Sequence, residues 1–482
     1  MSTWDVIVIG AGAAGENAAQ YAIQNSERTA ALVEHELVGG ECSYWACMPS
    51  KVLLRPVELL DGARAVPGVS QMLSGSLDLE AVFRRRDSFT HNHDDSSQVK
   101  WASGAGIDVV RGTARLAGEK TVELTEADGS TRSLQARHAV VVATGTIAAV
   151  PPVDGLREAM PWTSRDVTNM RELPERVLVV GGGVVACESS TWLNGLGAKE
   201  VTVVEIEPSL LGGQEPFVGE TMAEQFAERG IKVVVGTKVE SVERPDVKDT
   251  GVGRIHGGPA TITAGGSTFE VDEIVVAAGR TPVTDDIGLQ RIGLDVSKSD
   301  GYLTTDDHMA VVGGGDWLYA VGDVNGRALL THMGKYQGRI AGDVIAARAD
   351  GRSIEGLRFR DVADHDIVPA VVFSEPQVAS VGITEATARE RGIDVQALEY
   401  EIGKVAGASV LRDGYTGKAR LVVDSATDTL VGATFLGPDV AELLHAATIA
   451  IVGKVTLETL WHAVPSYPTV SEIWLRLLEA RN

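Results

Sequence analysis

The residues with the clearest redox chemistry are Cys42 and Cys47, five positions apart in the stretch GECSYWACMPSK, residues 40–51. On a regular helix this spacing would separate the two Cα atoms by about 8 to 9 Å, whereas a disulfide needs about 4.4 to 6.8 Å. If the two cysteines bond, the segment must begin irregular and become helical only near Cys47. Such a bridge is reactive, because a helix N-terminus favours a thiolate. Two unrelated buried cysteines are the alternative, and the spacing alone does not decide.

A nucleotide-binding pattern precedes the cysteines. An apolar run of strand length, residues 5–9, leads into the turn GAGAAG of residues 10–15, and residues 16–23 read as a helix. A second strand, residues 29–33, ends at Glu34. This order of strand, glycine turn, helix, strand and acid is the pattern of a dinucleotide-binding unit, in which the acid accepts from ribose hydroxyls.

The three glycines of this turn have separate physical roles. Gly10 permits the tight turn, Gly12 lets the backbone approach a diphosphate, and Gly15 lets helix and strand pack closely. The diphosphate would lie at the helix N-terminus, where free N–H groups and the helix dipole favour an anion. The first 35 residues therefore predict a bound dinucleotide.

Placed after this unit, residues 39–51 resemble the redox-active segment of the flavoprotein disulfide reductases, a family that includes dihydrolipoamide dehydrogenase, glutathione reductase and mercuric reductase. The resemblance implies that the first unit binds FAD. It also implies that Cys47 faces the flavin as the charge-transfer thiolate and that Cys42 is the interchange thiol that attacks the substrate.

A second dinucleotide unit begins after Pro151 and Pro152. Residues 176–180 form an expected strand, GGGVVA at 181–186 forms the turn, and a second strand ends at Glu205. A carboxylate there accepts from the ribose 2′-OH and repels a 2′-phosphate, so we expect NADH to be preferred over NADPH. Two such units in one chain are typical of hydride transfer between a resident and a visiting cofactor.

The resemblance marks further site residues. Glu188 matches the family's glutamate that pairs with the lysine after the redox segment, here Lys51, and Cys187 beside it reads as a core thiol. The expected cofactor contacts are Gly10, Gly12, Ala14, Gly15, Glu34, Glu41, Cys42, Lys51, Ala114, Ala143, Thr144, Gly145, Arg280, Asp323, Leu330, Thr331, His332, Gly181, Gly183, Val185, Glu188, Glu205 and Gly279.

Between these units the pattern is less specific. Short strands are expected at 107–110, 121–124 and 133–136, followed by a buried strand from His138. His91, His93, Asp94 and Asp95 could suggest a metal site, but we interpret them as a solvated helical face and expect no metal, because no third cluster of ligands lies nearby. These segments carry little functional signal.

From about residue 357 the composition changes to alternating strands, at 368–373, 419–423 and 430–437, followed by a helix at 440–452. This part resembles the family's dimerisation domain, so a homodimer is expected. The predicted fold is α/β, with two Rossmann-like dinucleotide-binding domains and a C-terminal α+β dimerisation domain. The predicted boundaries are 1–150 (FAD, first part), 151–278 (NAD), 279–350 (FAD or central, second part) and 351–482 (dimerisation).

The C-terminal segment departs from the family. Most members carry an acid–base histidine before Pro-Thr, whereas this chain has Tyr467 before Pro468-Thr469, with the matching Glu472 retained. His462 lies five residues earlier and is not expected to take the role. A tyrosine has a pKa of about 10 and is a poor base at neutral pH. Ordinary reduction of lipoamide or glutathione disulfide is therefore in doubt.

The amino-acid composition disfavours several classes of binding partner. The chain has 66 acidic and 43 basic residues among 482, a formal charge of −23. This charge disfavours nucleic acid and anionic membranes as partners, and no apolar run is long enough to span a bilayer. With three cysteines and no signal sequence, we expect a soluble cytoplasmic protein.

The predicted function is transfer of electrons from NADH through FAD to a Cys42–Cys47 disulfide, and from there to a disulfide or related small-molecule acceptor. One alternative is reduction of quinones or of a second pyridine nucleotide directly from the flavin. A non-enzymatic redox sensor is the last alternative.

Overall fold

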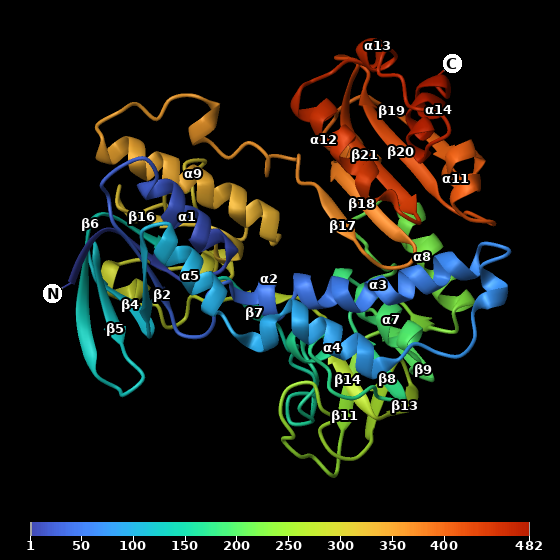
Figure 1. Ribbon diagram of the computed structural model, residues 1–482, viewed down its shortest axis with the longest axis horizontal. Coiled ribbons are helices and arrows are strands. Elements are labelled where there is room, and N and C mark those ends of the chain that lie inside the picture. Colours follow the sequence, from blue (N-terminus) through green and yellow to red (C-terminus); the bar gives the residue numbers. More distant parts are fainter. Residues whose placement is uncertain (1, 482) are drawn as a thin grey trace. The chain divides into compact units, whose positions relative to one another are not determined.

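The computed structural model describes residues 2–481, which divide into two compact units. The first unit comprises residues 2–48, 87–147 and 280–365, and the second comprises 49–86, 148–279 and 366–481. Their elements can be followed by colour in Figure 1. The two nucleotide patterns of the sequence lie in different units.

The first unit is built on one sheet whose strand order is β3-β2-β1-β6-β5-β4, with β16 paired to β6. Strands β3, β2, β1, β6 and β16 run parallel to their neighbours in this group, and β4 and β5 add an antiparallel edge. The strands are β1 (Ser2–Ile9), β2 (Ala30–Glu34), β3 (Ile107–Arg111), β4 (Thr113–Gly118), β5 (Thr121–Thr125), β6 (Thr131–Val142), β7 (Thr146–Ala148), β15 (Arg280–Pro282) and β16 (Leu318–Ala320). The predicted strand at 133–136 and the one from His138 are therefore a single strand, β6.

Two helices of the first unit, α1 (Ala13–Ile23) and α9 (Thr331–Ala349), lie side by side (Figure 1). Glycines on α9 make this approach possible. A Cβ at Gly338 would lie 2.4 Å from the carbonyl oxygen of Ala14, and one at Gly342 would lie 2.5 Å from Cβ of Tyr21. The N-termini of both helices are thereby fixed relative to each other. The other helices here are α2 (Gly40–Tyr44) and α5 (Ser96–Gly104).

The second unit contains the parallel sheet β10-β9-β8-β14, the antiparallel sheet β11-β12-β13 and the antiparallel sheet β17-β18-β21-β20-β19. The strands are β8 (Arg176–Val180), β9 (Glu200–Val204), β10 (Lys232–Val234), β11 (Val239–Glu243), β12 (Ala260–Ala264), β13 (Ser267–Val271), β14 (Glu273–Val276), β17 (Ala370–Val372), β18 (Gln377–Gly382), β19 (Val395–Glu401), β20 (Lys418–Asp424) and β21 (Thr429–Gly437). The helices are α3 (Cys47–Arg64) and α4 (Leu79–Phe89), which both cross the division between the units, and α6 (Ser164–Thr168), α7 (Val184–Leu196), α8 (Pro216–Glu228), α10 (Glu385–Glu390), α11 (Ala406–Leu411), α12 (Leu444–Val452), α13 (Leu457–Leu460) and α14 (Ile473–Glu479).

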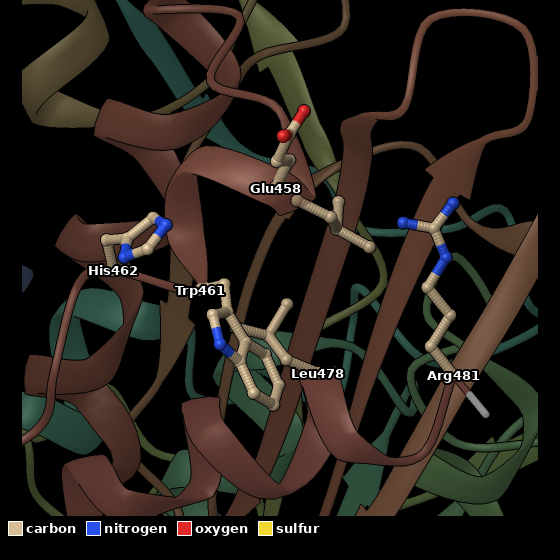
Figure 2. Close-up of a pocket in the computed structure, with 6 residues that line it drawn as sticks. Glu458, Trp461, His462, Leu478 and Arg481 are labelled. Atoms are coloured by element: carbon tan, nitrogen blue, oxygen red, sulfur yellow. The ribbon is translucent and has the colours of Figure 1, made fainter.

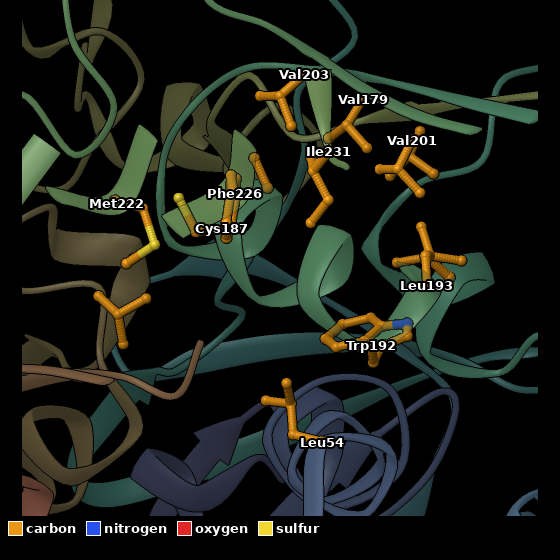
Figure 3. Close-up of a cluster of buried hydrophobic side chains, with 14 of the residues drawn as sticks. Leu54, Val179, Cys187, Trp192, Leu193, Val201, Val203, Met222, Phe226 and Ile231 are labelled. Atoms are coloured by element: carbon orange, nitrogen blue, oxygen red, sulfur yellow. The ribbon is translucent and has the colours of Figure 1, made fainter. Parts of the chain in front are cut away.

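One hydrophobic cluster of the second unit joins segments far apart in the sequence. Figure 3 shows Trp192 and Leu193 of α7 with Leu54 of α3, and Phe226 of α8. Cys187 is fully buried in this cluster and its thiol faces the carbonyl oxygen of Gly182 at 3.6 Å. Burial raises the pKa of this thiol, so Cys187 is a packing residue.

The described residues include neither a membrane-spanning helix nor a metal-binding cluster. Among residues 2–481, no helix combines the length and apolar character needed to cross a membrane. Across the same residues, no group of three or more His, Cys, Asp and Glu side chains could hold a metal ion. The predicted domain boundaries stay predictions.

Candidate active site

The cysteine segment consists of two helices separated by a break. Cys42 lies on the short helix α2, Trp45 and Ala46 interrupt the helix, and Cys47 is the first residue of α3. The irregular start was expected only for a disulfide-bonded pair, and the structure shows the free thiols with a helix that begins at Cys47. Gly39 makes α2 possible, because it precedes the helix with a φ of 112°. Both cysteines are half-buried free thiols.

The two thiols share one hydrogen-bond network with Thr331, the first residue of α9. Cys47 Sγ lies 3.2 Å from Thr331 Oγ1, and the Cys42 thiol hydrogen bonds to both of these side chains. The hydrogen bond to Cys47 and then burial raise the pKa of Cys42, and the charge of Lys335 opposes that rise. The hydrogen bond to Thr331 opposes the rise more strongly than Lys335 does.

Lys51 and Glu188 form an ion pair within the second unit. Lys51 Nζ lies 2.8 Å from Glu188 Oε2 and 3.1 Å from Oε1, and the carboxylate is almost completely buried. Phe373 supports both partners, because its N–H donates to Glu188 Oε1 at 2.9 Å and its ring centroid lies 4.9 Å from Lys51 Nζ. Lys51 follows Cys47 by one turn of α3. Sequence reasoning gave the Lys51–Glu188 pair through the resemblance and missed Phe373.

The first glycine turn forms a backbone cradle. Gly10 has a φ of 100°, and a Cβ there would lie 2.4 Å from the carbonyl oxygen of Ala143. A Cβ at Gly40 would lie 2.8 Å from Cα of Gly12, so the start of α2 approaches the turn closely. Gly12 is the N-cap of α1 and offers no side chain to the free N–H groups. These groups fit the diphosphate of a dinucleotide.

Glu34 and Glu205, the acidic residues of the two nucleotide patterns, make the same kind of backbone hydrogen bonds. Glu34 accepts hydrogen bonds from the N–H groups of Ala11 and Glu36, both at 2.8 Å. In the second unit, Glu205 accepts from the N–H groups of Gly182 and Glu207, the latter at 2.7 Å. Each carboxylate therefore holds its own glycine turn in shape. The GGGVVA turn continues into Gly183, the N-cap of α7.

A polar cluster closes the other side of the first unit's sheet. Thr146 Oγ1 donates to Asp323 Oδ2 at 2.9 Å, and Arg280 donates to Thr146 through Nε at 2.5 Å and Nη2 at 2.7 Å. Burial raises the pKa of Asp323, with Thr146 and Arg280 opposing it. The neighbouring Thr144 Oγ1 donates to the carbonyl oxygen of Val283 at 2.7 Å. These groups could receive polar atoms of a cofactor.

The remaining expected contacts lie on several elements. Leu330 caps α9 and His332 is exposed in its first turn; Ala114 is buried on β4, and Ala143 and Gly145 follow β6. Val185 is exposed in the first turn of α7, Gly181 and Gly279 have φ values of 112° and 124°, and Glu41 lies in the first turn of α2. Ala14 and Gly15 belong to the first turn of α1.

The structure does not bring Tyr467 and Glu472 together. Tyr467 is 75% exposed, whereas Glu472 is buried and accepts a hydrogen bond from Arg476 at 2.7 Å. His462 lies elsewhere, at a surface pocket of about 220 Å³ lined by Leu457, Glu458, Trp461, His462, Leu478 and Arg481. Figure 2 shows His462 and Arg481 on opposite sides of Trp461 and Leu478.

One aromatic contact was missed entirely. His93 stacks on Trp45 with 4.3 Å between ring centroids, and it also lies near Tyr44 at 6.3 Å. The residues from His91 to His93 form a single 3₁₀ turn in which all three have positive φ. The interpretation as a solvated helical face was therefore wrong for His93. No periodicity could have shown it, because a strained turn places the ring.

Comparison with known proteins gives one consistent result. Residues 4–339 match the model of the pyridine nucleotide-disulphide oxidoreductases, and residues 368–477 match the model of their dimerisation domain. The chain is 33% identical to a dihydrolipoyl dehydrogenase of Chlorobaculum parvum over 478 residues, which is 97% of this chain and 95% of that protein. It is 29% identical to a mercuric reductase of Staphylococcus aureus over 470 residues, 97% of this chain and 81% of that protein.

Solved structures show the same architecture. The Cu(II) complex of RclA, an HOCl-induced flavoprotein disulfide reductase from Escherichia coli, is similar with a TM-score of 0.84. The identity is 21%, and the match covers 100% of both chains. At this identity the likeness concerns the fold alone. Together with the two family models, it confirms the predicted fold class.

Proposed function

Because the chain belongs to the pyridine nucleotide-disulphide oxidoreductase family, we propose that it uses NADH, FAD and the Cys42–Cys47 pair to reduce a disulfide or a related electrophilic acceptor. The observation that carries the proposal is the contact of Cys47 Sγ, at the N-terminus of α3, with Thr331 at the N-terminus of α9. The N-termini of two helices lie at this contact, and a helix N-terminus favours the thiolate form of a cysteine.

The residues of the first unit fit FAD. The Gly10 turn and the N-terminus of α1 would hold the diphosphate, Glu34 would meet a ribose, and Asp323 would accept from the ribityl chain. Bound FAD would supply two-electron redox chemistry between a nicotinamide and a disulfide. In the second unit, the Gly181 turn and Glu205 would hold NADH.

The chain's own residues then perform thiol–disulfide exchange. Reduction of the enzyme disulfide by NADH leaves two thiol sulfurs. The Cys42 thiolate attacks one sulfur of a substrate disulfide, forms a mixed disulfide and releases the first product thiolate. The Cys47 thiolate attacks Cys42 Sγ, which re-forms the enzyme disulfide and releases the second thiolate. The proton of NADH oxidation and one from solvent complete the two product thiols.

Lys51 has a separate role, because it lies on the same helix as Cys47. We expect its ammonium, fixed by Glu188 and Phe373, to place a positive charge near the flavin. Buried Glu188 is held by two donors, so Lys51 keeps one position.

A thiol count tests the proposal. One equivalent of NADH, added without oxygen to the oxidised FAD-loaded protein, should produce two new thiols per chain, and none in Cys47→Ser. Bleaching of the flavin absorbance without new thiols in the native protein would overturn the role of the cysteine pair.

The second candidate is direct reduction of quinones or of a second nucleotide from the flavin. The observation that favours it is Tyr467, which stands at the family's histidine position and is 75% exposed. Turnover with a quinone that is equal in native protein and Cys42→Ser, together with no turnover on any disulfide, would favour this candidate.

A homodimer is also proposed. The dimerisation domain presents large exposed apolar side chains, and those between residues 449 and 467 are Ile449, Val452, Trp461, Val464 and Tyr467. Exposed apolar residues concentrated in one stretch of a domain mark an interaction surface. In the family's arrangement, this surface meets a second copy.

A further inference from the structure

We propose that His93 is a positioning residue for the redox pair. By stacking on Trp45 it holds the short helix that carries Cys42, and it thereby sets how readily the Cys42–Cys47 disulfide is reduced. The inference rests on the proposed disulfide reduction, in which the two sulfurs bond and separate in every turnover. His93 acts through Trp45 and belongs to a segment distant in the sequence from both cysteines.

The helix α2 is contacted on both of its flanks by the segment that precedes α5. On the N-terminal side, the N–H of Val38 donates to Asp95 Oδ2 at 2.7 Å. On the C-terminal side, the ring of Trp45 stacks on His93, with 4.3 Å between the ring centroids and 29° between the ring planes. Cys42 lies between these two contacts. The contacts therefore limit the positions that Cys42 can take relative to Cys47.

Asp95 is directed at the chain before α2. It is the N-cap of α5, a position whose side chain ordinarily accepts from the first free N–H groups of the helix, but within the described chain it makes no such capping hydrogen bond. Its carboxylate accepts from Val38 and pairs with Arg111 Nη2 at 2.5 Å. Arg111 Nη1 also donates to the carbonyl oxygen of Glu36 at 2.8 Å. Charge-assisted hydrogen bonds, which are the stronger kind, thus fix this end of α2.

An unusual turn places the His93 ring. His91, Asn92 and His93 have successive φ values of 48°, 51° and 61°, a region that residues with side chains seldom adopt. Such conformations persist only where the surrounding structure holds them, and they cluster at functional sites. Asp95 follows this turn after one residue, so both contacts to α2 come from a single short segment.

Tyr44 completes the packing between the two segments. It is buried, and its ring centroid lies 6.3 Å from that of His93. Its hydroxyl donates to the carbonyl oxygen of Val38 at 3.1 Å. Burial raises the pKa of Tyr44 to about 12, so the hydroxyl remains a neutral donor. Both aromatic residues between the two cysteines therefore lie near His93.

Loss of the His93 ring should make the disulfide easier to reduce. Reduction converts the disulfide, two electrons and two protons into two thiols. Without the stack, the reduced segment would adopt more conformations, and formation of the disulfide would have to remove them. One aromatic pair is worth about a three- to tenfold change in an equilibrium. We expect a shift of that size toward the thiols, which corresponds to about 14 to 30 mV.

The test equilibrates the FAD-loaded protein, without oxygen, with reduced and oxidised dithiothreitol in set ratios. The Cys42 and Cys47 thiols are counted by alkylation after an acid quench. Each disulfide that is reduced oxidises one dithiothreitol, so the ratio at half reduction gives the equilibrium constant. In His93→Ala the constant for reduction should rise about three- to tenfold. His91→Ala, the same change at an exposed residue of the same turn, is the matched control and should change nothing.

Two further variants separate the stack from a general loss of stability. In His93→Phe the constant should stay within about twofold of native, because a phenyl ring also stacks on an indole. Asp95→Ala releases Val38 and should shift the constant in the same direction as His93→Ala. A residue that only stabilises the fold would lower the unfolding temperature and leave the constant as native. A native constant in His93→Ala or Asp95→Ala, an equal shift in His91→Ala, or no rescue in His93→Phe would overturn the proposal.

Failure of this inference is distinguishable from failure of the proposed function. The equilibrium is set by dithiothreitol and needs no NADH. If NADH yields no thiols in native protein but His93→Ala shifts the equilibrium, the positioning role stands and the overall reaction falls. If NADH yields two thiols and His93→Ala has the native equilibrium, the overall reaction stands and the positioning role falls.

Discussion

The two reactive cysteines differ in what surrounds each sulfur. Cys47 lies at the N-terminus of α3, whereas Cys42 is hydrogen bonded to Cys47 in a way that raises its pKa. A cysteine that is stabilised as a thiolate is suited to charge transfer to a flavin, as expected for Cys47. A cysteine that stays protonated until it reacts is suited to attack the substrate, as expected for Cys42.

This difference predicts an optical signature. Cys42→Ser frees Cys47 from the disulfide, so the oxidised FAD-loaded variant should show a long-wavelength charge-transfer band before any reductant is added. Absorbance spectroscopy measures it directly. Cys47→Ser is the matched control and should show no band; a band in that variant would reverse the two assignments.

Glu205 sets the expected nucleotide preference. It directly follows β9, with its carboxylate fixed by two backbone N–H groups, and we expect it to accept from a 2′-OH and to repel a 2′-phosphate. The loss of one charged hydrogen bond together with added repulsion amounts to about 2 to 3 kcal/mol, or roughly thirty- to a hundredfold. The ratio of kcat/KM for NADH and NADPH should favour NADH by this factor. A kcat/KM ratio near one would mean that residues other than Glu205 recognise the 2′-phosphate.

Glu16 predicts a pH dependence of stability. Its pKa is about 7 in the folded protein against 4.5 for the ordinary group, so the folded state binds a proton more tightly than the unfolded state does. Stability is therefore unaffected below about pH 4.5 and decreases as the pH rises toward 7 and above, by about 3 kcal/mol at most. Glu16→Gln removes this loss. Thermal unfolding should show a larger gain for the variant at pH 8 than at pH 5.5; equal shifts would contradict the linkage.

At the scale of elements, the α1–α9 contact positions the site, because α9 begins at Thr331, which contacts Cys47. Gly338→Ala should destabilise the protein by about 1 to 3 kcal/mol, since the new Cβ would lie 2.4 Å from the Ala14 carbonyl oxygen. FAD retention should weaken with it. Gly62→Ala on α3 is the control, because a Cβ there meets nothing within 4 Å; it should be neutral or slightly stabilising. Chemical denaturation measures both.

The sequence predicted the elements that local pattern defines. Strand β8 was placed at its observed bounds and β2 within one residue, because glycine turns and apolar runs mark both. Strand β4 was missed and β6 was split in two, since antiparallel partners, rather than local composition, fix where those strands end. Phe373 and the His93 stack escaped prediction because each depends on contacts between segments distant in sequence.

At the scale of the whole molecule, the missing histidine concerns the dimer. In the family this residue acts in the partner subunit's site, and here Tyr467 occupies the position on an exposed segment. The chain nevertheless keeps Glu472, whose Oε2 is buried and has no hydrogen-bond partner.

Tyr467→His tests whether the dimer can recover the family's chemistry. General acid–base assistance is typically worth about 10²- to 10⁴-fold, so turnover of lipoamide or glutathione disulfide should rise measurably near neutral pH. The gain needs Glu472 to orient the imidazole, and Arg476 competes for that carboxylate at 2.7 Å. Tyr467→His combined with Glu472→Gln should therefore lose most of the gain. Quinone reduction should change little in either variant, because it needs only the reduced flavin. Native protein that already reduces a simple disulfide at the rate of Tyr467→His would contradict this prediction and would mean that another group activates Cys42.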